Sequence, residues 1–119
     1  MPHNDDQAIR RTLQHYITGA ISGKIDDLRP AFHEDAMLHG YLGPEYTAMP
    51  IEKFYEWHLA NGPATDLSAD VAAIDIEGTI ATARLELDNW TGHRFTDMFT
   101  LLKHGGEWKI ISKVFHLHA

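Results

Sequence analysis

Two side chains in the last quarter of the sequence have the types needed for acid–base chemistry, namely the carboxyl group of Asp97 and the imidazole of His116. Asp97 interrupts an otherwise apolar strand pattern, and His116 lies near the end of a second one. Inside an apolar cavity such a pair has shifted pKa values and could move a proton next to a carbonyl group. Asp97 could equally serve only the fold, by hydrogen bonding to the backbone or to His116.

The relative position of these two residues depends on the turn between their strands. The glycines at 105–106 tolerate the positive φ that tight hairpin turns require, so we predict a hairpin around them. Phe99 then lies opposite Ser112, and Asp97 shares a face with His116. The bulkier face, which we assign to the helices, carries Phe95, Asp97, Phe99, Leu101, Trp108, Ile110, Ser112, Val114 and His116.

Further side chains are candidates for contact with a ligand. They offer a phenol, an imidazole, a hydroxyl group or an aromatic ring near the predicted cavity: Tyr16, His33, His39, Tyr41, Tyr55, Phe99, Trp108 and Ser112. A tyrosine hydroxyl can donate to a ligand oxygen, but each phenol could also lie at a rim with its hydroxyl in water.

A metal ion is a further alternative, because His116 and His118 lie two residues apart on one strand face. Two histidines close to a chain end are few ligands, however, and the sequence has no cysteine. We therefore expect no metal site and no cofactor.

The bulk composition limits the classes of partner. The chain has 119 residues and a formal net charge of −7, which argues against nucleic acids and anionic membranes because both require a basic surface. No apolar run is long enough to span a membrane, and the residues after Met1 do not resemble a signal peptide. We expect a single domain over residues 1–119 in the cytoplasm.

The pattern of apolar residues predicts an α+β fold. Asn4 can cap a first amphipathic helix, and the strands that follow are linked by glycine-containing turns. The predicted elements are helices at 4–22, 26–32 and 50–60, a short strand at 37–41, an edge segment at 45–49, and long strands at 69–77, 79–90, 95–103 and 108–118.

Four segments resemble a known family: 15–23 (HYITGAISG), 31–36 (AFHEDA), 95–103 (FTDMFTLLK) and 108–115 (WKIISKVF). They are similar to the putative lumazine-binding branch of the nuclear transport factor 2-like superfamily, which also includes ketosteroid isomerase, scytalone dehydratase and the polyketide cyclases. The resemblance implies a curved antiparallel sheet wrapped against three helices as a cone with an internal pocket. Enzymes, binding modules and adaptors share this fold, so the resemblance does not fix a function.

Three functions remain open. We expect a pocket for a small apolar or aromatic molecule, centred on Asp97 and His116. The alternative is a cofactor-independent isomerase, dehydratase or cyclase that uses these two residues as its acid–base pair. A third is a dimerisation module, since we also expect a homodimer through the apolar outer sheet face. The candidate residues for that interface are Met98, Thr100, Leu102, Ile111 and Phe115.

Overall fold

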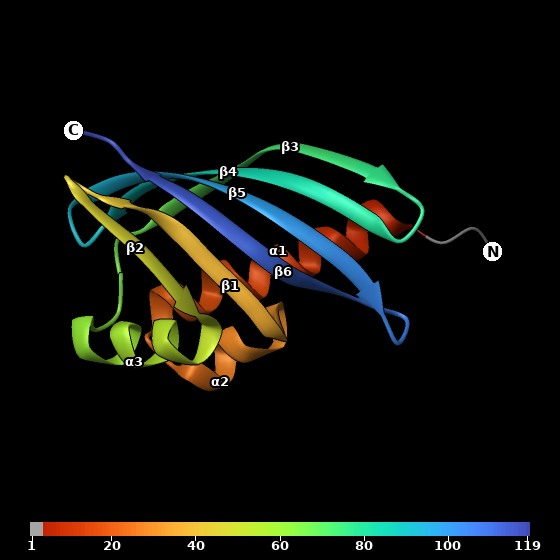
Figure 1. The fold of residues 1–119 in the computed structure, drawn as a ribbon, viewed down its shortest axis with the longest axis horizontal. Coiled ribbons are helices and arrows are strands. Elements are labelled where there is room, and N and C mark those ends of the chain that lie inside the picture. Colours follow the sequence, from red (N-terminus) through yellow and green to blue (C-terminus); the bar gives the residue numbers. More distant parts are fainter. Residues whose placement is uncertain (1–3) are drawn as a thin grey trace.

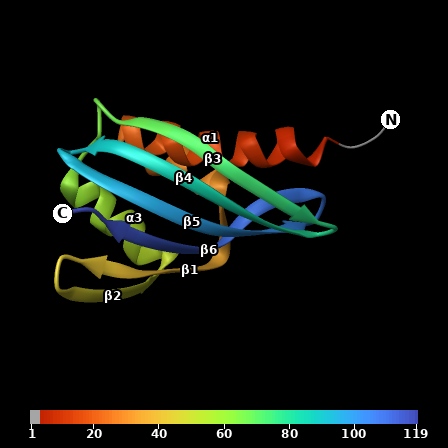
Figure 2. The same cartoon turned by 90° about the horizontal axis from the view of Figure 1, so that it is seen from above.

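The computed structural model describes residues 4–119, and the first three residues of the predicted domain lie outside this range. A six-stranded curved sheet has its helices on one side (Figures 1 and 2). The elements are α1 (Asp5–Ser22), α2 (Ile25–Leu28), the short 3₁₀ helix η1 (Arg29–Ala31), β1 (Phe32–Leu42), β2 (Glu45–Pro50), α3 (Ile51–Asn61), β3 (Ser68–Glu77), β4 (Ile80–Trp90), β5 (His93–His104) and β6 (Glu107–Leu117). The α+β prediction is confirmed.

Helix α1 begins and ends where the sequence predicts. The side chain of Asn4 accepts a hydrogen bond from the backbone N–H of Gln7 at 3.0 Å, and Gly23 adopts a φ of 74° just after the helix. The apolar stripe of the helix packs against the inner face of the sheet. Its buried residues are Ile9, Thr12, Leu13, Tyr16, Gly19 and Ala20.

The sheet has the strand order β2-β1-β6-β5-β4-β3. Strands β3 to β6 form the antiparallel meander that the sequence predicts. The first and last strands, β1 and β6, pair in parallel, which brings Gly40 opposite Phe115. A Cβ atom at Gly40 would lie 2.5 Å from the carbonyl oxygen of Phe115, so only glycine fits this close approach. The pairing joins the β1–β2 hairpin to the meander in one continuous sheet.

The hairpin turn lies at Gly105 and Gly106 as predicted, with φ values of 58° and 81°, but the register beyond it differs from the prediction. Leu101 pairs with Ile110, whereas Thr100 pairs with Ser112. Ile111 is therefore an extra residue in β6 and forms a β-bulge.

The bulge reverses which side chains of β6 face the helices. Beyond it Phe99 pairs with Lys113, and Asp97 pairs with Phe115. The predicted pairing of Phe99 with Ser112 is wrong, because that prediction assumed strict alternation from the turn to the end of the strand. Lys113 and Phe115 therefore point into the cone, and His116 does not.

A second irregularity directs Trp90 into the cone. Leu87 pairs with Phe95 and Trp90 pairs with His93, so β4 has an extra residue between these pairs. Asn89 in this segment has a φ of 65°, a conformation that asparagine tolerates better than most residues. Leu87 and Trp90, three positions apart, are consequently both buried.

The outer face of the sheet carries exposed apolar side chains. Ile80, Met98 and Val114 are 51%, 52% and 50% exposed. Phe115, predicted to lie on this face, instead lines the interior, so that prediction is wrong. Within residues 4–119, no helix has the length and apolar character needed to cross a membrane.

Candidate functional site

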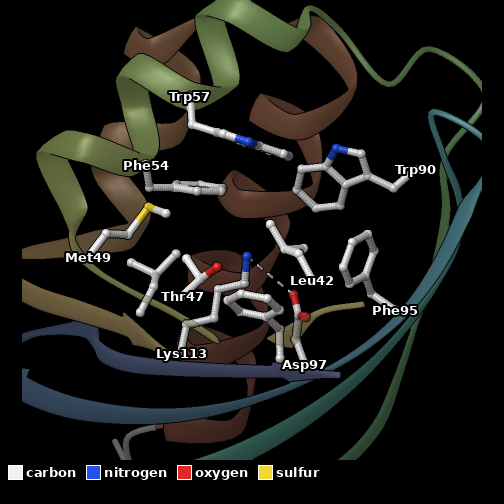
Figure 3. Close-up of a pocket in the computed structure, with 11 residues that line it drawn as sticks. Leu42, Thr47, Met49, Phe54, Trp57, Trp90, Phe95, Asp97 and Lys113 are labelled. Carbon is white, nitrogen blue, oxygen red and sulfur yellow. Dashed lines mark ion pairs between the residues drawn. The ribbon is translucent and has the colours of Figure 1, made fainter. Parts of the chain in front are cut away.

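A cavity lies between helix α3, the β1–β2 hairpin and the inner face of β5 and β6 (Figure 3). Its volume is about 40 Å³, and all the space that atoms leave empty there, open solvent included, is about 420 Å³. Most of its walls are aromatic or aliphatic, as is usual for small-molecule sites. The lining residues are Leu38, Leu42, Thr47, Met49, Phe54, Trp57, Trp90, Phe95, Asp97, Lys113 and Phe115.

Two opposite charges lie together on the sheet side of this cavity (Figure 3). Asp97 comes from β5 and is 1% exposed, while Lys113 comes from β6 and is 5% exposed. Lys113 Nζ lies 3.8 Å from Asp97 Oδ2, and the dashed line in Figure 3 marks this ion pair. The separation exceeds the usual length of a hydrogen bond. The ammonium group can therefore donate to a bound molecule while the carboxylate remains near.

A hydrogen bond from helix α1 positions the carboxyl group of Asp97. Tyr16 is fully buried, and its hydroxyl donates a hydrogen bond to Asp97 Oδ2 at 2.8 Å. The other oxygen, Oδ1, is buried and has no hydrogen-bond partner among residues 4–119. An unsatisfied buried acceptor of this kind costs about 1–3 kcal/mol, a cost that a bound hydrogen-bond donor removes.

Burial shifts the pKa values of this trio. It raises the pKa of Asp97, against the opposing effects of the Lys113 charge and the Tyr16 hydrogen bond. It lowers the pKa of Lys113, which the Asp97 charge partly offsets. The pKa of Tyr16 is raised well above its ordinary value, chiefly by burial and then by Asp97, so its hydroxyl remains a donor. Burial thus weakens the preference of both groups for their charged forms.

Aromatic rings surround the ammonium group of Lys113. Its Nζ lies 4.4 Å from the ring centroid of Phe54, 5.0 Å from Tyr16, 5.4 Å from Trp90 and 5.5 Å from Phe115. All four distances are within the range of cation–π attraction. The rings replace part of the hydration that burial removes.

The predicted contact between Asp97 and His116 is wrong. His116 is exposed on the outer face of the sheet, opposite Thr96, and its ring lies 4.8 Å from that of His118. The bulge at Ile111 is the reason, because it moves each following side chain of β6 to the opposite face of the sheet from the one predicted. Lys113, and not the predicted His116, lies beside Asp97.

Three other predicted ligand contacts from β5 and β6 lie outside the cavity lining. Phe99 and Trp108 are buried in the core of the cone, and the Trp108 indole Nε1 donates to Asp5 Oδ1 at 3.1 Å. Ser112 pairs with the exposed Thr100 and so lies on the outer face.

The remaining candidates come from β1 and α3, earlier in the chain, and the cavity lining does not include them. His33 is half-buried, and its Nδ1 accepts a hydrogen bond from the backbone N–H of Asp35 at 3.0 Å. His39 and Tyr41 lie on the outer face of β1, where Tyr41 is 59% exposed. Tyr55 is buried beneath the guanidinium group of Arg29, and burial raises the pKa of its phenol to about 12.

Sequence reasoning missed the role of Lys113 and the aromatic walls. A usable signal existed, because Asp97 and Lys113 are opposite charges that interrupt two neighbouring apolar strands. As for metals, no cluster of three or more histidine, aspartate or glutamate side chains suited to an ion occurs in the described part of the chain.

The six-stranded sheet wrapped on three helices defines a nuclear transport factor 2-like fold. The model of the family described as putative lumazine-binding matches residues 4–116, and the chain belongs to this family. An NTF2-like protein of unknown function from Methylobacillus flagellatus KT is 43% identical, with a TM-score of 0.93 over 100% of this chain and 96% of that one. A second NTF2-like protein of unknown function, from Shewanella baltica OS155, is 35% identical, with a TM-score of 0.90 over 97% and 94% of the two chains.

A curated relative has a named activity. The protein called "Aldolase FrzH" from a Cladobotryum species is 24% identical over 110 residues, which cover 92% of this chain and 88% of that protein. Together, the family and these relatives support a ligand-binding or enzymatic cone fold.

Proposed function

We propose that this protein binds a small, largely apolar carbonyl compound in the cone cavity and transfers a proton next to the carbonyl group. The observation that carries the proposal is the buried pair of Asp97 and Lys113 in a largely apolar, aromatic-walled cavity. Paired charges in such a place are expensive to bury and are frequent at functional sites.

The two groups are suited to the two halves of an enolisation. The carboxylate of Asp97 removes a proton from the carbon beside the carbonyl, and Lys113 stabilises the negative charge that develops on the carbonyl oxygen. Their separation of 3.8 Å allows one small molecule to contact both groups. Tyr16 orients the carboxyl group through its 2.8 Å hydrogen bond and does not line the cavity.

The name of the Cladobotryum relative supports this chemistry, since an aldol reaction begins with removal of a proton next to a carbonyl group. Isomerisation, dehydration and cyclisation of carbonyl compounds start in the same way. The proposal therefore concerns the shared first step.

Proton exchange in D₂O tests the proposal directly. Cyclohexanone and acetophenone are incubated with the protein, and the loss of the proton signals beside the carbonyl is followed by NMR. We expect exchange above the buffer rate for at least one ketone, and Asp97→Asn should slow it by about 100-fold or more. Asp75→Asn, an exposed carboxylate of β3, is the matched control and should leave the rate unchanged. Wild-type rates equal to buffer, or full activity in Asp97→Asn, would contradict the proposal.

A second candidate is binding of a flat aromatic molecule without turnover. The rings of Phe54 and Trp57 are stacked, with centroids 6.0 Å apart and an angle of 16° between their planes, and both residues line the cavity. A planar ligand can extend such a stack. Mass spectrometry of molecules retained through purification checks this candidate. A heteroaromatic compound bound in the absence of any ketone exchange would favour it over the enzyme.

A further inference from the structure

We propose that Lys113 is a nucleophile that forms a covalent imine with the carbonyl compound. The inference rests on the proposed function, because it concerns the same cavity and the same class of molecule. It goes further by assigning the bond that holds the substrate.

Lys113 differs in its surroundings from the other three lysines that form ion pairs. Its side chain is 6% exposed and borders the cavity, whereas the side chains of Lys53, Lys103 and Lys109 are 67%, 26% and 25% exposed. Lys103 and Lys109 form ion pairs near the surface, and Lys53 pairs with the exposed Glu56. Among these four amines, that of Lys113 is the one that borders the aromatic-walled cavity.

The environment of Lys113 favours a reactive amine. A lysine attacks a carbonyl carbon only as the neutral amine, and desolvation in an apolar pocket is a common way to produce that form near neutral pH. Burial lowers the pKa of Lys113 in this way. For a purely electrostatic role an arginine would suit better, because its guanidinium group stays charged when buried.

The neighbouring groups can handle the protons of imine formation. Nζ of the neutral amine attacks the carbonyl carbon, and the amine proton moves to the carbonyl oxygen to give a carbinolamine. Protonated Asp97 then donates its proton to the departing hydroxyl group, water leaves, and a positively charged iminium forms beside the Asp97 carboxylate. That carboxylate next removes a proton from the adjacent carbon to give an enamine. The raised pKa of Asp97 suits a group that gives and regains a proton.

The aromatic rings around Nζ suit the iminium product. An iminium ion is a weakly hydrated cation, and the rings of Phe54, Tyr16, Trp90 and Phe115 lie 4.4–5.5 Å from the nitrogen. Cation–π attraction and the Asp97 carboxylate stabilise this charge in place of water. The same apolar walls limit the entry of water that would hydrolyse the bond.

Reductive trapping tests the inference on the wild-type protein. The protein is incubated with cyclohexanone and sodium cyanoborohydride, which reduces iminium ions to stable amines, and is then digested with a protease that cuts beside acidic residues. Peptide mass spectrometry locates the adduct. We expect Lys113 to be labelled at least tenfold faster than Lys53, with the excess growing below pH 8, where exposed lysines are protonated. Lys113→Arg should abolish this adduct, and Lys53→Arg should leave it unchanged.

The outcomes separate the inference from the function on which it rests. Labelling of Lys113 no faster than that of Lys53 in the folded wild-type protein overturns the imine, whether or not the variant folds. If ketone exchange then continues and still depends on Asp97, the proposed proton transfer stands without a covalent bond. The absence of both exchange and labelling overturns both proposals. Labelling of Lys113 without exchange supports the imine and contradicts catalysis of proton transfer.

Discussion

The ion pair between Asp97 and Lys113 permits a quantitative prediction about folding stability. Asp97→Asn removes the negative charge but keeps an oxygen that can accept the hydrogen bond from Tyr16. Lys113→Met removes the positive charge and keeps an unbranched side chain of similar length. Each single variant leaves one buried ionisable group without its partner, and the double variant leaves none.

The expected magnitude follows from the geometry. Two unit charges 3.8 Å apart interact by about 4 kcal/mol at an effective dielectric constant of about 20. Removal of one partner from a buried pair costs about 3–5 kcal/mol, because the remaining charge is neither solvated nor paired. We therefore expect each single variant to lose about 3 kcal/mol. The double variant should be more stable than the sum of the two losses predicts, by about 2–4 kcal/mol.

Urea unfolding at pH 7, followed by tryptophan fluorescence, measures these free energies. The three tryptophans include Trp57 and Trp90 in the cavity wall, so the probe also reports on the site. The mutations need to leave the slope of the unfolding curve unchanged for the comparison to hold. Additive losses, with a coupling energy below about 0.5 kcal/mol, would show that the two charges do not interact in the folded protein and would refute this reasoning.

Three further predictions concern the rest of the fold. Burial lowers the pKa of His58 from its ordinary value of 6.5, so the unfolded chain binds the proton more readily and the free energy of unfolding should fall as the pH drops below about 6.5. His58→Phe should flatten this pH dependence in unfolding experiments at pH 5 to 7, and an unchanged slope would contradict the prediction. Gly40→Ala should lower the free energy of unfolding by about 1–3 kcal/mol, since its Cβ meets the Phe115 carbonyl oxygen, and a neutral result by thermal unfolding would refute the close approach. The homodimer expected through the outer sheet face should dissociate in Val114→Asp, and light scattering that finds a monomeric wild type at micromolar concentration would rule it out.

The fold could be predicted from the sequence because its local signals agree with one another. Asn4 and Gly23 mark both ends of the first helix, and glycines mark the strand turns, as at Gly78 and Gly105. The inward orientation of Asp97 also follows from alternation along its own strand. These features depend on residues close together in the chain.

The cavity could not be predicted fully, because it depends on the bulge at Ile111 and on the pairing of β1 with β6, and neither has a clear sequence signal. The bulged residue, Ile111, directly follows a second isoleucine, Ile110, so either one fits the inner face. No glycine or proline marks the site. The parallel pairing of β1 with β6 joins segments about 75 residues apart, and residue patterns alone do not specify such a contact.

The bulge at Ile111 also divides strand β6 into two parts with different surroundings. Before it, Trp108 and Ile110 are packed in the core; after it, Lys113 and Phe115 line the cavity. A homologue that lacks the extra residue would keep the same side chains inside, since Ile110 and Lys113 would then alternate regularly through Ser112. An alignment of such a pair needs a gap at this point, and one without it would assign the wrong residues to the ligand. The single inserted residue thus determines which later side chains of β6 face the cavity.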